Sequence, residues 1–261
     1  MYSNEHKKYL KKIKTNKKII ISSRILIILF FLTLWEILAK NEIINPFLTS
    51  SPSKVIITIA ELYKQNNLLG HIWTTLYETV ISFLTASLIG LIIASILWSN
   101  NTLFKILDPY LTILNSLPKV SLGPLIIIWI GANTNSIIFM TLLITIFTAI
   151  INIYTSFTNT DKQKITLMKS FGANKLQIFT KLVLRGNIIP LINTLKINIS
   201  LSLIGVIMGE LLVSKKGLGY LITYGSQIFN LNLVITSIFI LGIISYLLYL
   251  SIDLLEKKLN K

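Results

Sequence analysis

The chain has 261 residues, of which 53% are apolar and 13% charged, and its formal net charge is +15. Soluble domains carry about 25% charged residues, so a soluble protein of this composition would expose larger apolar patches than monomers usually tolerate. The composition therefore argues against a soluble enzyme and predicts side chains that face lipid.

Six apolar segments are long enough to cross a bilayer, for which a helix needs about 20 residues. They span residues 19–38, 73–98, 107–130, 137–157, 191–213 and 233–251. Residues 120–160 contain no charge, and as one helix they would extend about 60 Å. We therefore expect a turn at the Gly-Ala-Asn-Thr-Asn sequence of residues 131–135. The sequence predicts an all-α, polytopic membrane protein with about six transmembrane helices.

The basic residues are distributed unevenly between the two sides of the predicted membrane. Of the 25 Lys and Arg, 18 lie in the N-terminal tail, the loops after the second and fourth segments and the C-terminus, against five on the other side. By the positive-inside rule both termini are cytoplasmic, and we expect a multi-pass protein of the cell membrane. Binding of the tail to anionic lipid or nucleic acid is the alternative, but we favour a role in topology.

These patterns divide the chain into three parts. We assign residues 1–18 to a basic cytoplasmic tail, 19–45 to a first transmembrane helix and 70–255 to a transmembrane domain that includes a cytoplasmic loop at 158–189. The first apolar segment follows a basic stretch, as in a secretory signal. No clear A-x-A cleavage site follows it, so we expect it to remain as a helix.

Motifs for catalysis are missing from the sequence. There is no G-x-x-x-x-G-K-[ST] phosphate loop, no G-x-S-x-G elbow and no H-E-x-x-H pair. Without cysteine there is no thiolate nucleophile or sulfur-ligated zinc, and the distant His6 and His71 predict no metal site. We therefore predict no catalytic residue and expect a transport protein, powered by an ion gradient or by a separate energy-supplying subunit.

The loop at 158–189 has a helical pattern, because its apolar residues recur at spacings of three and four. Two such stretches flank Gly172 and Ala173, and glycine permits the left-handed backbone that often ends a helix. We expect two short amphipathic helices joined at this glycine, with one face on the membrane domain and another offered to a partner. A helix that lies on lipid head groups is the alternative.

Five stretches, taken together, resemble the permeases of ATP-binding-cassette (ABC) importers. KSFGANKLQIFTKLVL (169–184) resembles their cytoplasmic coupling loop, the EAA loop. Four other stretches agree in order: PFLTSSPSKV (46–55), LDPYLTILNSLPKVSLGPLIIIWIG (107–131), SLIGVIMGELL (202–212) and GLGYLI (217–222). The similarity covers roughly residues 46–255 and is nearest to the nitrate/sulfonate/taurine subgroup, which includes transporters of thiamine-precursor-like molecules.

The resemblance implies a type I ABC importer permease fold (ABC transmembrane type-1) that forms the translocation pathway for a small solute. It implies three partners: an ABC ATPase that binds ATP, a second permease copy in a homodimer, and an extracytoplasmic solute-binding protein. The permease itself would hold no cofactor and catalyse no reaction. A self-contained secondary transporter and a non-transporting membrane scaffold are the alternatives.

The coupling loop departs from the family pattern at three places. Its Glu-Ala-Ala is replaced by Thr-Leu-Met at residues 166–168, one expected proline is Arg185, and another lies one position late, at Pro190. The glycine and the flanking helical pattern are retained. The contact residues implied for the ATPase are Thr166, Leu167, Met168, Lys169, Phe171, Gly172, Ala173, Gln177 and Phe179.

Four residues are candidates for the translocation pathway. Pro118, Gly123 and Pro124 interrupt the third segment, and broken helices are tolerated where protein or a cavity covers the freed backbone groups. Simple helix packing is the alternative for this break. Glu210 is an ionisable group inside a predicted span; a structural hydrogen bond to a backbone or hydroxyl group near the outer boundary is weighted equally.

The segment after the fifth span carries Gly217, Gly219 and Tyr220. We expect a tight outer turn there, followed by a short helix near the exterior surface. A structural role or a gate is favoured over a binding site.

Overall fold

The computed structural model describes residues 4–65 and 68–259, which form helices and connecting turns without a strand. The membrane-length helices are α1 (Asn4–Lys40), α4 (Leu68–Ser99), α7 (Thr134–Thr158), α11 (Ile188–Val213) and α13 (Leu231–Leu259). A sixth span is broken: α5 (Asn101–Ser116) meets the 3₁₀ turn η1 (Lys119–Leu122) and α6 (Gly123–Ile130) at an angle of 81°. The predicted all-α class is confirmed, and each predicted segment corresponds to one of these spans.

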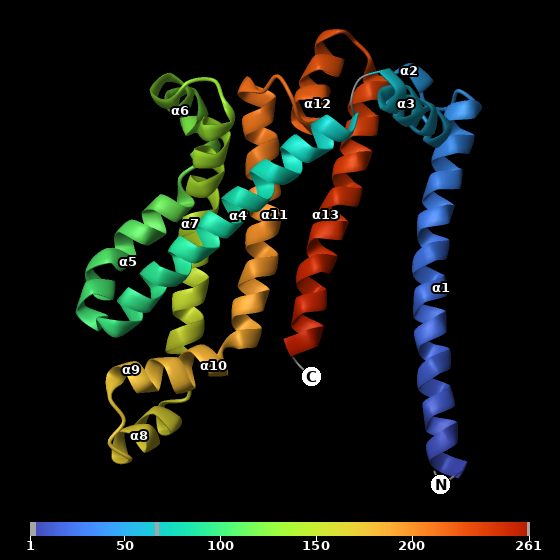
Figure 1. Ribbon diagram of the computed structural model, residues 1–261. Helices are drawn as coiled ribbons and strands as arrows, with labels where there is room; N and C mark the ends of the chain where they lie inside the picture. The colour runs from blue at the N-terminus through green and yellow to red at the C-terminus, as the bar shows by residue number, and fades with distance from the viewer. Residues whose placement is uncertain (1–3, 66–67, 260–261) are drawn as a thin grey trace.

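Shorter helices connect the spans on both sides. On the side of the C-terminal end of α1 lie α2 (Pro46–Thr49), α3 (Pro52–Gln65) and α12 (Leu218–Gln227). At the opposite end lie α8 (Lys162–Ser170), α9 (Lys175–Ile178), a π-helical turn η2 (Phe179–Val183) and α10 (Leu184–Gly186) (Figure 1). The start of α1 and the end of α13 lie toward the same end as α8 and α9, an arrangement that agrees with two termini on one side of a membrane.

The centre of the bundle is formed by α4, α7 and α11, with α13 packed against α11 (Figure 1). Small residues allow the close approach that membrane helices need. A Cβ on Gly90 of α4 would lie 2.7 Å from the Cβ of Ala149 on α7, and one on Gly205 of α11 would lie 3.0 Å from the Thr141 side chain of α7. These helices therefore pack almost backbone to backbone.

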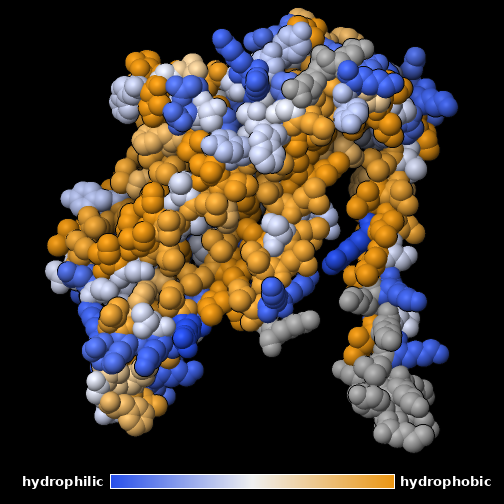
Figure 2. Space-filling model, viewed as in Figure 1, coloured by the Kyte–Doolittle hydropathy of each residue, from blue (hydrophilic) through white to orange (hydrophobic). Residues whose placement is uncertain are grey.

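Hydrophobic residues cover the middle height of the molecule, and hydrophilic residues gather toward its two ends (Figure 2). Many large apolar side chains on the outside of the spans are exposed, among them Leu88 on α4 and Ile243 on α13. Such a band would be unfavourable in water but matches the hydrocarbon layer of a bilayer. The prediction of lipid-facing side chains agrees with this arrangement.

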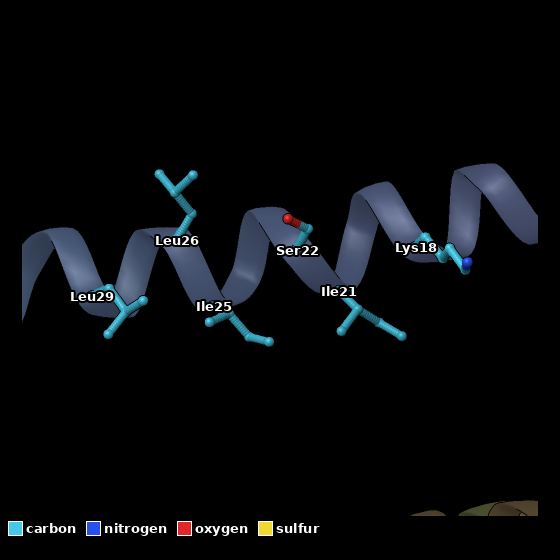
Figure 3. A pocket seen from close by; sticks show the side chains of 6 residues that line it. All are labelled: Lys18, Ile21, Ser22, Ile25, Leu26 and Leu29. Atoms are coloured by element: carbon cyan, nitrogen blue, oxygen red, sulfur yellow. The ribbon is translucent and has the colours of Figure 1, made fainter.

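Helix α1 stands apart from the central bundle (Figure 1) and contacts α2 and α3. The contact is polar: the Glu36 carboxylate accepts hydrogen bonds from the Ser53 backbone N–H (3.0 Å) and hydroxyl (2.8 Å). Figure 3 shows side chains along the apolar part of α1, where Ile21, Ile25 and Leu29 project from one side of the helix. These side chains line a shallow hollow, and all the residues around it belong to α1. The hollow is therefore part of a helix surface and not an enclosed cavity.

Two predicted boundaries differ from the structure. Residues 4–18 of the predicted basic tail continue into the span as one helix, and this helix ends at Lys40 instead of residue 45. Lysine has a high helix propensity, and nothing in the sequence interrupts the helix before the apolar segment. The basic stretch thus extends the first span at one end.

Near the end of α13, a charged cluster joins α13 to α11. The Lys196 ammonium on α11 pairs with Asp253 (3.2 Å) and Glu256, and Asp253 also pairs with Lys257 (2.6 Å). The side chains of Lys196, Asp253 and Glu256 are largely buried. This cluster fastens the ends of α11 and α13 on the side where α8 and α9 lie.

Candidate functional site

The cytoplasmic loop contains two helices that turn at Gly172, as the sequence predicts. Gly172 has φ of +76°, a left-handed conformation in which a side chain is strained. Its N–H donates to the Lys169 carbonyl at 2.9 Å, and the N–H of Ala173 donates to the Met168 carbonyl at 3.0 Å. These bonds satisfy the last carbonyls of α8 and close the helix.

Side-chain caps begin both helices of the loop. The Asp161 carboxylate accepts from the Gln163 N–H at 2.8 Å at the start of α8. At the start of α9, the Asn174 side chain accepts from the Gln177 N–H and the Gln177 side chain accepts from the Asn174 N–H, both at 2.9 Å. This reciprocal capping box fixes where α9 begins, so the turn between the helices is confined to residues 171–174.

The loop has two apolar faces. Ile178 and Val183 are buried, and Met168, Ala173 and Phe179 pack beside them against the membrane helices. The opposite face carries exposed apolar side chains, Leu167 (55% exposed), Phe171 (80%) and Leu176 (70%). Of the other predicted contact residues, the exposed ones are Thr166, Lys169, Gly172 and Gln177. Leu176 is part of the same surface, although the sequence-based set of contact residues omits it.

The break in the third span is built around Pro118 and Gly123. Pro118 precedes η1 and is exposed, and Pro124 is exposed in the first turn of α6. Gly123 is buried instead: a Cβ there would lie 2.7 Å from Leu212 and 3.2 Å from the sulfur of Met140. The glycine thus packs α6 onto α7 and α11, while the two prolines face outward.

Lys119 lies within this break, beside the middle of α7. Its ammonium group donates to the Asn115 carbonyl (2.9 Å) and side-chain oxygen (3.3 Å), and lies 5.5 Å from the centre of the Phe147 ring. The Thr148 hydroxyl also donates to the Asn115 side chain at 3.1 Å. Among the described residues, no carboxylate forms an ion pair with Lys119.

Glu210 lies inside the protein near the outer end of α11 and is 1% exposed. The Thr75 hydroxyl of α4 donates to its Oε1 at 2.7 Å, and the Gly219 N–H donates to its Oε2 at 2.6 Å. The preceding N–H groups are also bound: Leu218 donates to Thr75 Oγ1 at 2.9 Å and Gly217 to His71 Nδ1 at 3.0 Å. Side chains of α4 and α11 thus bind three consecutive N–H groups at the start of α12.

This arrangement agrees with the structural alternative for Glu210. The first N–H groups of a helix have no partner within the helix, and a carboxylate is favoured at this positive end. Here the partners come from other spans, so they tie α12 to the bundle. Tyr220 adds a stacked contact with the His71 ring, with centroids 5.9 Å apart. The predicted outer turn and short helix are present, and we name these contacts between α12 and the His71, Thr75 and Glu210 side chains the outer latch.

The two glycines of this turn are required by the carboxyl group behind them. Gly217 has φ of +107°, and a Cβ on it would overlap the Glu210 carboxyl group. A Cβ on Gly219 would lie 2.7 Å from the Cβ of Glu210. Only a backbone without side chains can approach the carboxylate this closely.

Replacing Thr75 with valine is expected to destabilise the protein by about 1–3 kcal/mol, because it leaves the Leu218 N–H and a Glu210 oxygen buried without partners. Thermal unfolding of the purified protein measures this loss. The matched control is Thr74→Val, since within the described part of the chain the Thr74 hydroxyl bonds only to the Gly70 carbonyl of its own helix. Equal unfolding temperatures for the two variants would contradict the assigned role of Thr75.

Sequence reasoning missed two members of the outer latch. It considered His71 only as a metal ligand and did not single out Thr75. Both lie on one face of α4, four residues apart, but their partners are about 140 residues away in the chain. No local pattern signals such a pairing, which becomes visible only when α4 and α12 are placed together.

The comparisons with known proteins agree with this architecture. Residues 86–261 match the family described as the binding-protein-dependent transport system inner membrane component. A probable ABC transporter permease protein of Haemophilus influenzae is 31% identical over 90% of this chain and 96% of its own length. The formylaminopyrimidine transport permease protein ThiX of Halalkalibacterium halodurans is 29% identical over 87% of this chain and 92% of its own.

A solved structure has the same fold. The MetNI methionine ABC transporter in an inward-facing conformation matches with a TM-score of 0.66 and 20% identity, over 74% of this chain and 96% of that chain. Fold, family match and relatives therefore agree. The chain belongs to the family of binding-protein-dependent transport system inner membrane components and is a membrane-spanning permease subunit of an ABC transporter.

Proposed function

We propose that this permease takes up a small solute as one of two identical copies, each carrying an ATPase on the loop formed by α8 and α9. The ATPase binds and hydrolyses ATP, and an extracytoplasmic solute-binding protein delivers the solute. One observation carries this proposal: the loop exposes Leu167, Phe171 and Leu176 on the side away from the membrane helices. An apolar surface of this kind, surrounded by lysines, suits a protein partner better than water.

The proposed substrate is a small solute of the nitrate/sulfonate/taurine or thiamine-precursor class. The similarity to ThiX, whose name gives formylaminopyrimidine as its solute, supports the second possibility. The five family-like stretches in the sequence support the wider subgroup that contains both classes. Identification of the ligand of the cognate binding protein would decide between these classes.

We place the translocation pathway along the broken third span. Lys119 supports this placement, because an ionisable side chain at membrane depth without a charged partner marks a functional site by default. The exposed Pro118 and Pro124 lie on the same broken span. Glu210 does not belong to this pathway in our proposal, since its oxygens already bind α4 and α12.

Reconstitution into vesicles tests the proposed function. We expect uptake of the binding protein's ligand only when permease, ATPase, binding protein and ATP are all present. Permease vesicles without ATPase, tested with and without an ion gradient, are the control. Accumulation by these vesicles would support a secondary transporter, and a complete system without uptake would support a scaffold.

A further inference from the structure

The loop that contains α8 and α9 also holds the end of α4. Phe179, the first residue of η2, contacts the rings of Trp98 near the end of α4 and Phe157 near the end of α7. The ring centroids lie 5.1 Å apart in the first pair and 5.4 Å apart in the second, which meets edge to face. Aromatic pairs at such separations stabilise by more than their buried area alone. The Phe179 side chain therefore joins three elements that are far apart in the sequence.

A lysine of the loop binds the same end of α4. The Lys175 ammonium group of α9 donates a hydrogen bond to the carbonyl of Ser99, the last residue of α4. The last carbonyls of a helix have no partner within the helix, and a cation is favoured at this negative end. We name the contacts of Phe179 and Lys175 with Trp98, Ser99 and Phe157 the inner grip.

The surroundings of the inner grip are densely packed. Phe157 is 0% exposed, Leu97 is 1% exposed and Ile178 is 3% exposed. Together with Trp98 and Phe179 they belong to one apolar cluster. Close-packed side chains transmit a displacement because they leave little free volume between them. A movement of the loop must therefore either displace the end of α4 or break the inner grip.

Helix α4 differs from its neighbours in how it is connected to the loop. The loop continues along the chain into α7 at one end and into α11 at the other, whereas α4 is followed by α5. Helix α4 meets the loop through the side chains of the inner grip. Its opposite end carries His71 and Thr75, which bind the start of α12 in the outer latch. One helix of 32 residues, about 48 Å long, thus connects the loop with the outer latch.

We propose that Phe179 and Lys175 are positioning residues for energy coupling: they make α4 move with the loop, so that a displacement caused by the ATPase reaches α12 at the outer surface. This inference rests on the proposed ATPase contact. It assigns different roles to two faces of the loop. Leu167, Phe171 and Leu176 bind the ATPase, whereas Phe179 and Lys175 hold α4. Loss of the inner grip therefore leaves the ATPase bound but weakens the link between ATP hydrolysis and transport.

The test measures the number of solute molecules taken up per ATP hydrolysed, in vesicles that contain the full-length permease, ATPase and binding protein. Phe179→Leu keeps an apolar side chain but removes both ring contacts. We expect this ratio to fall about fivefold or more, while the ATPase still copurifies with the variant. Phe171→Ala, on the exposed face, should instead lose the ATPase. A loss of stability alone would lower uptake and hydrolysis together, so an unchanged ratio for Phe179→Leu would overturn the proposal.

Lysine variants test the second contact of the inner grip. Lys175→Met keeps most of the side-chain length but cannot donate to the Ser99 carbonyl, so the uptake per ATP should fall. Lys175→Arg can donate this bond and should restore the ratio. Lys181→Met removes an exposed lysine of η2 and should behave like the wild type. Equal ratios for Lys175→Met and Lys181→Met would overturn the role of Lys175.

The outcomes distinguish this inference from the proposed function. If the wild-type system takes up no solute, or if Phe171→Ala retains the ATPase like the wild type, the proposed function or its ATPase contact is wrong and the inference fails with it. If the wild type transports but Phe179→Leu loses the ATPase as Phe171→Ala does, Phe179 is an ATPase contact, and only the inner grip is wrong.

Discussion

Replacing Gly172 with valine is expected to reduce ATP-driven uptake about tenfold or more. The residue has φ of +76°, and a left-handed conformation costs an L-residue about 1–2 kcal/mol, with a β-branched side chain among the least tolerated. The variant must therefore change the turn between α8 and α9. This change would move the exposed apolar residues of the two helices apart. Uptake in vesicles and copurification of the ATPase measure the effect.

The cause of this effect is conformational, because a Cβ on Gly172 would meet no atom within 4 Å. Gly186→Val is the matched control: it lies in the same cytoplasmic segment, its surroundings are equally open, and its φ is not positive. We expect this control to retain ATPase binding. If Gly172→Val bound the ATPase and supported uptake like the control, the loop would not be the coupling element.

Replacing Gly217 with alanine is expected to destabilise the protein by about 3 kcal/mol or more. Two costs combine: overpacking of a filled site, about 1–3 kcal/mol, and a left-handed backbone, about 1–2 kcal/mol. The added methyl group would overlap the Glu210 carboxyl group, so α12 must move away from its partners. Unfolding temperature and the yield of folded protein in the membrane measure this loss.

Gly242→Ala serves as the comparison for this variant. Gly242 lies within α13, has an ordinary φ, and a Cβ on it would meet nothing within 4 Å. Alanine there should be neutral or slightly stabilising, since it favours a helix over glycine. A Gly217→Ala protein as stable as Gly242→Ala would mean that α12 does not need its close contact with Glu210.

The sequence predicted those features that depend on local rules. Apolar length located the six spans, and polar turn residues located the break before α7. The helical spacing around Gly172 located the turn between α8 and α9, since a left-handed glycine ends a helix whatever surrounds it. The outer turn was predicted from Gly217 and Gly219, the two glycines that precede Tyr220.

Other features depend on which helices become neighbours. The 81° bend of the third span could not be predicted, because a proline marks the loss of a helical hydrogen bond but not the resulting angle. Likewise, one partner of Glu210 is Thr75 of α4, 135 residues earlier in the chain. The role of this residue therefore stayed open between pathway and structure until its neighbours were placed.

The short helices α9 to α10 meet the long α11 at Asn187, where the chain changes direction (Figure 1). The Asn187 side chain braces this corner with bonds of 2.8 Å to the Val183 carbonyl and the Thr160 hydroxyl. Near its far end, α11 carries Glu210, whose carboxylate accepts the Gly219 N–H of α12. A movement of the segment formed by α9, η2 and α10 would therefore turn α11. Because α11 crosses the membrane as one helix, that rotation would reach α12 at the opposite surface.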